Sequence, residues 1–181
     1  MKKTLIIVAH PDLDGASIAN HIIIDEVKEV LNVETRDLYK LYPNFEIDIQ
    51  SEQKALLEAD NIIFQFPLYW YSTPSILKEW QDKVLTYGFA FGAEGDKLKN
   101  KEFLISTTTG APEEAYQTDG YGTMKSLLAP LEQVAKMTEM VFNNPLVSFS
   151  MVCIPDVSSK EDVEQRAKNH VHKLKAWIAK R

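Results

Sequence analysis

The sequence lacks a cysteine pair, an excess of basic residues and a long apolar run. The single cysteine, Cys153, cannot form a disulfide within the chain, which suits a reducing compartment, so we expect a cytoplasmic protein. The 20 Lys and Arg residues against 26 Asp and Glu residues give a net charge of −6, which disfavours nucleic acid and anionic membranes as partners. The apolar run Leu5–Ala9 is too short for an export signal or a membrane span.

The composition is that of a globular protein. The chain has 181 residues, of which 45% are hydrophobic and 25% are charged. We find no internal repeat, low-complexity segment or linker, so we expect one domain over residues 1–181. A chain of this length can bury a full core without disulfides or metal ions.

Strand and helix patterns alternate along the chain. Five segments rich in β-branched and apolar residues predict strands: Leu5–Ala9, Val33–Leu38, Asn61–Phe66, Glu102–Thr107 and Leu146–Cys153. Five segments between or after them have helical spacing: Ser17–Leu31, Ser51–Glu58, Ser75–Leu85, Met124–Met140 with a kink or break at Pro130, and a last helix capped by Ser158 or Ser159. Between these elements, Tyr39–Ile49 is predicted to be irregular. The alternation predicts an α/β protein, a flavodoxin-like three-layer sandwich with a five-stranded parallel sheet.

In such a sheet the ligand lies beyond the carboxyl ends of the strands. The loop after the first strand contains His10 and leads to Ser17 and Asn20 at the start of a helix. This loop is either a phosphate cradle, with free N–H groups at the helix start, or an ordinary capped helix. The chain contains neither a G-x-G-x-x-G nor a G-x-x-x-x-G-K motif.

The loop after the third strand, Pro67–Pro74, contains three consecutive aromatic residues. We favour a wall and backbone-donor platform for a flat ring system, and the alternative is a hydrophobic plug or a subunit contact. After the fourth strand, Gly110 permits a close approach of the backbone to a ligand. Tyr116 and Tyr121 can donate hydrogen bonds to developing negative charge, although the segment around Tyr121 is also a good turn. Cys153 lies in an apolar run, where we expect a small buried residue rather than a nucleophile.

With these loops in place, the chain resembles the flavodoxin-like NAD(P)H:quinone oxidoreductases over roughly Thr4–Trp177. It is similar to the short bacterial members, which include general-stress oxidoreductases and the ancillary quinone-reductase subunit of glutathione-gated potassium efflux systems. The motifs that carry the resemblance are Ala9-His-Pro11 with Ser17-x-x-Asn20, Leu41-Tyr-Pro43 with Phe45-x-Ile-Asp48, Pro67-Leu-Tyr-Trp-Tyr-Ser-x-Pro74, Leu77-Lys-x-Trp80-x-Asp82-Lys-Val84 and Thr108-Thr-Gly110.

The resemblance implies a bound flavin and a homodimer with the site at the subunit interface. The residues that it assigns to the cofactor are His10, Ser17, Ile18, Asn20, Pro67, Leu68, Tyr69, Trp70, Thr108, Thr109, Gly110 and Tyr116. It assigns catalytic hydrogen bonding to Tyr116, and Tyr121 stands near the place where the family often has a histidine. We expect FMN rather than FAD because the chain is short, although FAD remains an alternative.

The implied reaction is ping-pong hydride transfer from NADH or NADPH to a quinone or similar acceptor, without a metal. A regulatory role beside a potassium efflux protein, with peripheral association with that membrane transporter, is compatible with this activity. The main rival is a metal-dependent hydrolase that uses His10 and Asp12, since His and Asp at a strand end are good ligands. The further ligands of such enzymes are missing from the sequence. A second rival is an electron carrier of the flavodoxin type.

Overall fold

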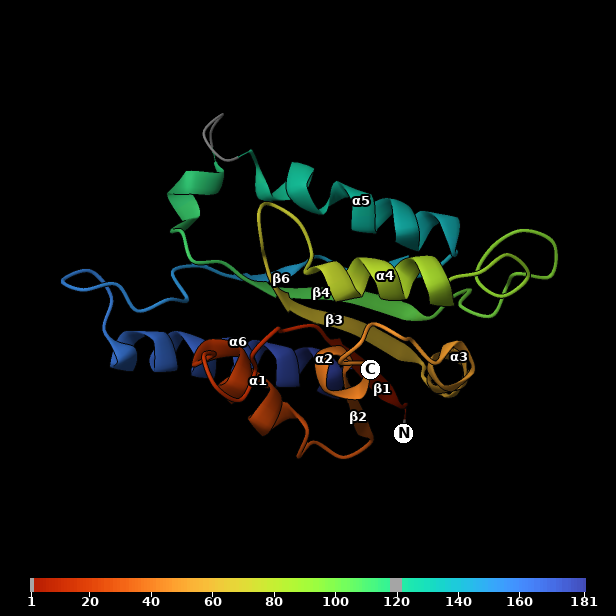
Figure 1. The fold of residues 1–181 in the computed structure, drawn as a ribbon, viewed down its shortest axis with the longest axis horizontal. Helices are drawn as coiled ribbons and strands as arrows, with labels where there is room; N and C mark the ends of the chain where they lie inside the picture. Colours follow the sequence, from red (N-terminus) through yellow and green to blue (C-terminus); the bar gives the residue numbers. More distant parts are fainter. Residues whose placement is uncertain (1, 118–121) are drawn as a thin grey trace.

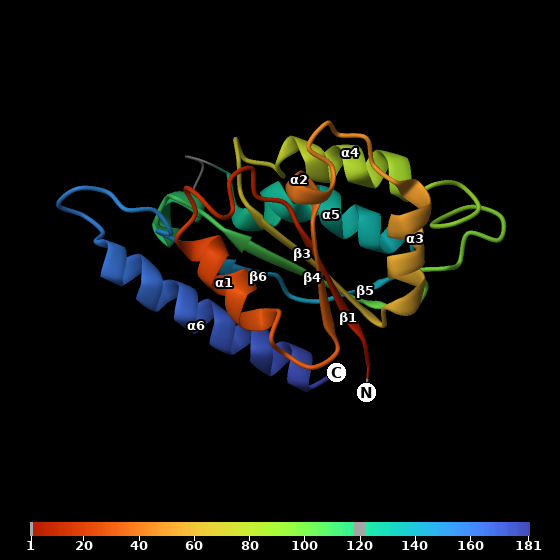
Figure 2. The same cartoon turned by 60° about the horizontal axis from the view of Figure 1, so that its bottom comes forward.

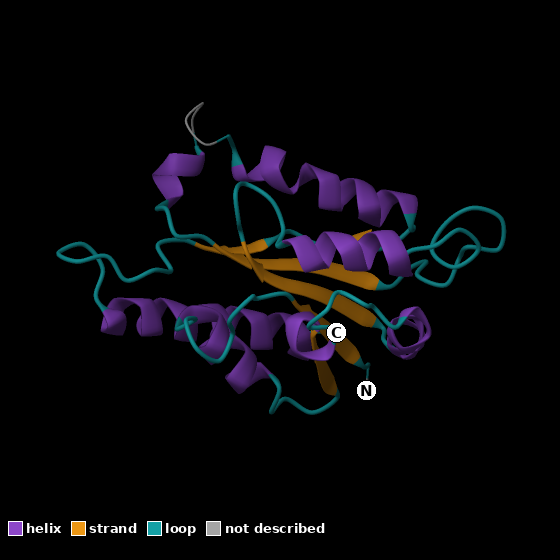
Figure 3. Ribbon diagram, in the orientation of Figure 1, coloured by secondary structure: helices purple, strands orange, loops and turns teal. Residues whose placement is uncertain are grey.

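The computed structural model describes residues 2–117 and 122–181. A parallel sheet runs through its centre, with helices on both faces (Figure 1, Figure 3). The strands are β1 (Thr4–Val8), β2 (Val33–Asp37), β3 (Asn61–Pro67), β4 (Glu102–Thr108), β5 (Val141–Phe142) and β6 (Leu146–Ser148). Their order is β2-β1-β3-β4-β5, and β6 also pairs with β4. The predicted flavodoxin-like fold is confirmed, because this is the doubly wound order of that class.

Two layers of helices cover the sheet. The helices are α1 (Ala19–Val27), α2 (Leu38–Leu41), α3 (Ile49–Glu58), α4 (Ser75–Val84), α5 (Met124–Met137) and α6 (Lys160–Ala179), with a 3₁₀ helix η1 (Glu113–Tyr116). Helices α4 and α5 lie on one face, and α1 and α6 lie on the other (Figure 1, Figure 2). The apolar strands contribute side chains to the cores on both faces of the sheet. Leu5 and Ile7 of β1 pack into the core under α4, whereas Ile6 and Val8 pack against α1 and α6.

The predicted fifth strand, Leu146–Cys153, is wrong in extent. Two short strands, β5 and β6, share its place beside β4, and β6 ends at Ser148. Pro145, which has no N–H to donate to a sheet, lies between them. Beyond β6, Ser150 has a φ of +54°, in the left-handed region, which turns the chain away from the strand direction.

Several helix boundaries also differ from the predictions. Asp48, not Ser51, caps α3, since its side chain accepts a hydrogen bond from the Ser51 N–H. Asp37 caps the short helix α2 within a stretch predicted to be irregular. Helix α1 is shorter than predicted, and α5 passes through Pro130 and ends at Met137. The last helix begins as predicted after Ser159, which forms a reciprocal capping box with Asp162.

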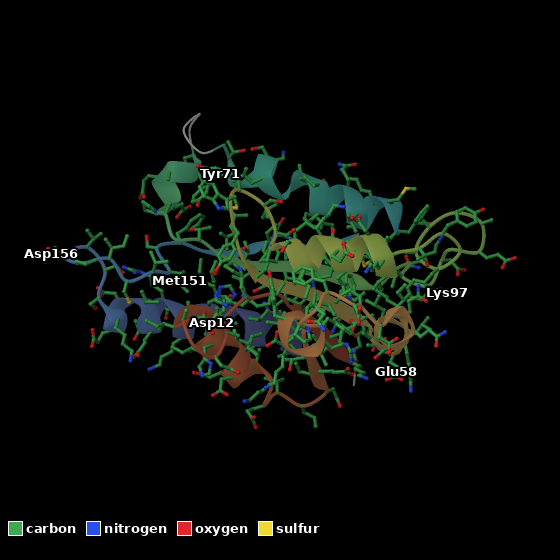
Figure 4. All side chains as sticks on the ribbon, in the orientation of Figure 1. Asp12, Glu58, Tyr71, Lys97, Met151 and Asp156 are labelled. Atoms are coloured by element: carbon green, nitrogen blue, oxygen red, sulfur yellow. The ribbon has the colours of Figure 1, made fainter. Side chains whose placement is uncertain are left out.

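The parallel arrangement brings the carboxyl ends of β1, β3, β4 and β6 to one edge of the sheet. Figure 4 shows Asp12, Tyr71 and Met151 toward this end of the molecule, with Glu58 and Lys97 toward the other. Within the described residues, no helix combines the length and apolar character needed to cross a membrane. The edge where these loops meet is where the fold places a ligand.

Candidate functional site

A cavity of about 370 Å³ opens at this edge of the sheet. The residues that line it are His10, Ala16, Ser17, Ile18, Asn20, Pro67, Leu68, Tyr69, Thr108, Thr109, Gly110, Met151, Val152 and Cys153. The three loops chosen from the sequence therefore meet around one space, and ten of the predicted cofactor-binding residues line it. Trp70 and Tyr116 do not line it, and Tyr121 lies outside the described residues.

The loop after β1 is held in a tight turn. The Asp12 N–H donates to His10 Nδ1 at 3.1 Å, and the Gly15 N–H donates to Asp12 Oδ1 at 3.0 Å. A Cβ at Gly15 would lie 2.5 Å from Asp12 Oδ1, so a larger residue there would displace this carboxylate. Asp12 is exposed and shapes the turn, whereas His10 is buried in the cavity wall, and burial lowers the pKa of its imidazole.

Free backbone donors lie at the start of α1. Ser17 Oγ accepts a hydrogen bond from the Asn20 N–H at 3.1 Å, but the N-cap position of α1 is held by Ile18 and not by the predicted Ser17. Within the described part of the chain, the N–H groups of Ser17, Ile18 and Ala19 donate no hydrogen bond. Because Ser17 and Ile18 line the cavity, this helix start can bind an anion there.

A buried amide ties the first loop to the centre of the sheet. Gln65 Nε2, on β3, donates to Asn20 Oδ1 at 2.8 Å, and Asn20 Nδ2 donates to Thr108 Oγ1, on β4, at 3.0 Å. Asn20 is 4% exposed and Gln65 is 0% exposed. Asn20 therefore has two roles: it lines the cavity and it connects the ends of three elements.

The turn after β3 presents its aromatic residues in an unusual backbone conformation. Tyr69 and Ser72 exchange two backbone hydrogen bonds of 2.9 Å, and Trp70 and Tyr71 between them have φ angles of +46° and +65°. Such turns favour Asn and Gly, so two aromatic residues there hold the backbone in a strained conformation. Tyr69 lines the cavity and its ring lies edge-on to His10, whereas the Trp70 side chain is 92% exposed.

The loops after β4 and β6 form the remaining side of the cavity. The Thr109 N–H donates to the Ser148 carbonyl at 2.9 Å, and the Met151 N–H donates to the Thr109 carbonyl at 2.8 Å. These bonds bring Met151, Val152 and Cys153 to the cavity, which the sequence reasoning missed. The prediction that Cys153 is buried is wrong, because the chain leaves the sheet after Ser148 and Cys153 is exposed at the rim.

One predicted donor, Tyr116, does not line the cavity, and the other, Tyr121, lies outside the described residues. Tyr116 is buried in η1, where its ring lies 5.7 Å from that of Phe149. At the cavity itself, the Gly110 N–H donates no hydrogen bond to any described residue. No group of three or more His, Cys, Asp or Glu side chains in the described residues could hold a metal ion.

Comparison with known proteins gives consistent matches over most of the chain. It is 42% identical over 176 residues to the uncharacterized NAD(P)H oxidoreductase YrkL of Bacillus subtilis, covering 96% of this chain and 98% of that protein. It is 43% identical over 149 residues to KefG of Cronobacter sakazakii, an ancillary protein of a glutathione-regulated potassium-efflux system, covering 81% of this chain and 80% of that protein.

Solved structures agree with these matches. General stress protein 14 of Treponema denticola, solved in complex with FMN, superposes with a TM-score of 0.85 at 32% identity, covering 96% of this chain and 98% of that one. An NADPH-quinone reductase from P. pentosaceus superposes with a TM-score of 0.78 at 32% identity, covering 94% and 96%. The family model described as "Flavodoxin-like fold" matches residues 2–178, and the chain belongs to this family.

Proposed function

We propose that the protein is an FMN-dependent NAD(P)H:quinone oxidoreductase that works by ping-pong, two-electron transfer. The observation that carries the proposal is the composition of a single cavity. N–H groups at the start of α1 that donate to no described residue line one part of it, and the aromatic turn after β3 and the Gly110 backbone line other parts. An anion site beside a slot lined by both apolar side chains and polar groups fits a flavin mononucleotide.

The phosphate end of the site would be formed by the first loop. The N–H groups of Ser17, Ile18 and Ala19 and the Ser17 hydroxyl would donate to the phosphate, and Asn20 would contact the ribityl chain. His10 in the wall is neutral around pH 7 because burial lowers its pKa, and it can gain a proton beside a bound dianion. Among the described residues, no Lys or Arg side chain lines the cavity, so backbone donors would supply most of the attraction.

The ring end of the site would be formed by the other two loops. Pro67, Leu68 and Tyr69 offer an apolar wall from β3 onward, with Trp70 beyond them, and Thr108, Thr109 and Gly110 offer the opposite edge. The Gly110 N–H, which donates to no described residue, can hold negative charge that develops on the ring during reduction. Roles for Tyr116 and Tyr121 as catalytic donors stay predictions.

The bound flavin would supply the redox chemistry, since it can take a hydride from NADH or NADPH and deliver it to a quinone in a separate half-reaction. Overall, NAD(P)H, a quinone and a proton would become NAD(P)⁺ and a hydroquinone. The similar proteins support this reaction. They include a protein described as an NAD(P)H oxidoreductase, an NADPH-quinone reductase, and general stress protein 14 solved in complex with FMN. The resemblance also supports a cytoplasmic homodimer with the site at the subunit interface.

A second candidate function is that of an ancillary protein for a potassium-efflux system, which the 43% identity to KefG favours. This role is compatible with quinone reduction. It would be tested by comparing potassium efflux in cells that carry the transporter with and without this protein. Unchanged efflux would exclude the ancillary role and leave the reductase proposal standing.

The first prediction concerns flavin uptake. The protein, incubated with FMN and freed of excess, is expected to retain a yellow absorption band that bleaches with NADH or NADPH and returns when a quinone is added. The measurement is a visible spectrum at each step, followed by release and identification of the cofactor, which separates FMN from FAD. Failure to take up any flavin would rule out the proposed function.

A substitution in the cavity provides a matched test. Gly110→Val is expected to weaken FMN binding about tenfold or more, because the new side chain would enter the cavity toward Val152, whose nearest methyl would lie 3.4 Å from a Cβ atom at position 110. Gly110 does not have a positive φ, so the fold should tolerate the change. Ala111→Val adds similar bulk one residue along, outside the cavity lining, and should bind FMN normally. Equal affinity of both variants and the wild type would place the flavin elsewhere.

A further inference from the structure

His170 is a buried histidine that takes no part in the proposed reaction. It lies on α6 with 0% exposure, between two serine hydroxyls from different strands. Its Nε2 atom is 2.7 Å from Ser106 Oγ on β4, and its Nδ1 atom is 2.8 Å from Ser148 Oγ on β6. In either neutral tautomer one ring nitrogen donates and the other accepts, so the ring can satisfy both contacts. Burial lowers the pKa of His170 to about 4, so the ring is neutral around pH 7.

Ser148 connects this histidine to the cavity. It pairs with Thr108 at the last position of β6, and its carbonyl accepts the Thr109 N–H. The Thr109 carbonyl in turn accepts the Met151 N–H at 2.8 Å. Thr108, Thr109 and Met151 all line the cavity, whereas Ser148 and His170 do not. The chain of contacts therefore runs from α6 through Ser148 to the two loops that form one side of the site.

The strand that bears Ser148 is short, pairs with β4 alone among the described strands, and lies at the margin of the core. It is only three residues long, Leu146–Ser148, and all three are half-buried. The next residues leave the sheet, with Ser150 in the left-handed region. A short strand at the margin of the core depends on individual hydrogen bonds more than a long buried strand does. Ser106, by contrast, lies within β4, which is seven residues long and buried from Phe103 onward.

We infer that His170 is a positioning residue for the cofactor cavity, which it holds in its binding geometry through the Ser148 hydroxyl. The inference rests on the proposed function, because it takes FMN as the ligand of the cavity. The two contacts of the imidazole then have different roles. The contact with Ser148 holds the loops of the cavity in place, and the contact with Ser106 anchors α6 to the sheet.

Paired serine variants test this distinction. Ser148→Ala and Ser106→Ala each remove one hydroxyl from the same ring. Ser148→Ala is expected to raise the dissociation constant of FMN about tenfold, while Ser106→Ala changes it less than about threefold. Ser106 is more buried than Ser148, so Ser106→Ala should lose at least as much free energy of unfolding as Ser148→Ala. The measurements are FMN fluorescence quenching for affinity and urea denaturation for stability.

Conservative replacements distinguish the effect of the hydroxyl on FMN binding from the effect of side-chain shape. Ser148→Thr keeps the hydroxyl and should bind FMN within about twofold of the wild type, whereas the similarly shaped Ser148→Val should bind like Ser148→Ala. If the Ser148 variants fail to fold, His170→Gln tests the same contact, because it removes the imidazole that joins the two serines. It should then weaken FMN binding to the extent expected for Ser148→Ala.

The outcomes are distinct. Equal effects of Ser148→Ala and Ser106→Ala on FMN affinity, or failure of Ser148→Thr to restore it, would overturn the positioning role. Wild-type protein that binds FMN together with such a result would leave the proposed function intact. Wild-type protein that binds no FMN would overturn the proposed function, and this inference with it.

Discussion

Replacing Arg36 with methionine is expected to lower the free energy of unfolding by about 4 kcal/mol. Glu52, on α3, is 0% exposed, and its carboxylate accepts hydrogen bonds from Arg36 Nε and Trp80 Nε1, each at 2.8 Å, and from the Tyr42 hydroxyl. Arg36 is the cation paired with it, with a second nitrogen at 2.6 Å. Methionine preserves much of the packing but leaves a buried carboxylate without a positive partner, which is costly in a medium of low polarity.

Urea denaturation around pH 7.5 measures the loss, and a thermal scan should show the melting temperature falling by about 10 °C. The matched control is Arg166→Met, since among the described residues Arg166 donates to the neutral Ser150 carbonyl and Ser158 hydroxyl, and its replacement should cost about 1–2 kcal/mol. Adding Glu52→Gln to Arg36→Met should recover much of the loss, because it removes the buried charge. Equal losses for the two arginine variants, or no recovery in the double variant, would show that the ion pair contributes little.

Most of the fold could be predicted because its strands have local signals. The run Leu5–Ala9 is apolar at every position, and β1 is buried on both faces as that pattern indicates. The prediction failed at the last position of the sheet, where β5 and β6 are held by pairing with β4 rather than by their own residues. The cap of α3 was predicted wrongly for a similar reason. Asp48 and Ser51 are both good capping residues, and only the geometry selects Asp48.

The site followed from topology more than from motifs. Parallel strands bring their carboxyl ends to one edge, so the loops after β1, β3 and β4 could be grouped before their geometry was known. Met151, Val152 and Cys153 were missed because the left-handed Ser150 and the hydrogen bond from Met151 to Thr109 redirect a segment that has the pattern of a strand. The predicted strand ran to Cys153, so the same topological rule would have pointed past these residues to the loop after Cys153.

The stability of the protein is expected to fall by about 2 kcal/mol between pH 7.5 and pH 5 through His170 alone. Burial lowers the pKa of this histidine from 6.5 to about 4 in the folded protein. Between these values the unfolded chain binds a proton that the folded chain does not, so acid favours unfolding. The contribution is complete above about pH 6.5 and falls as the pH drops toward 4, where the loss reaches about 3 kcal/mol.

The environment of the ring explains why protonation is costly. Its two neighbours are serine hydroxyls, and Lys173 is the charged group that acts on it, further lowering the pKa. Urea denaturation of the wild type and of His170→Gln at a series of pH values isolates the effect, because His10 and the carboxylates titrate in both proteins. The variant should be less stable at pH 7.5, and the gap should narrow or reverse by pH 5. Parallel stability curves would mean that the imidazole is charged, or solvated, in the folded protein.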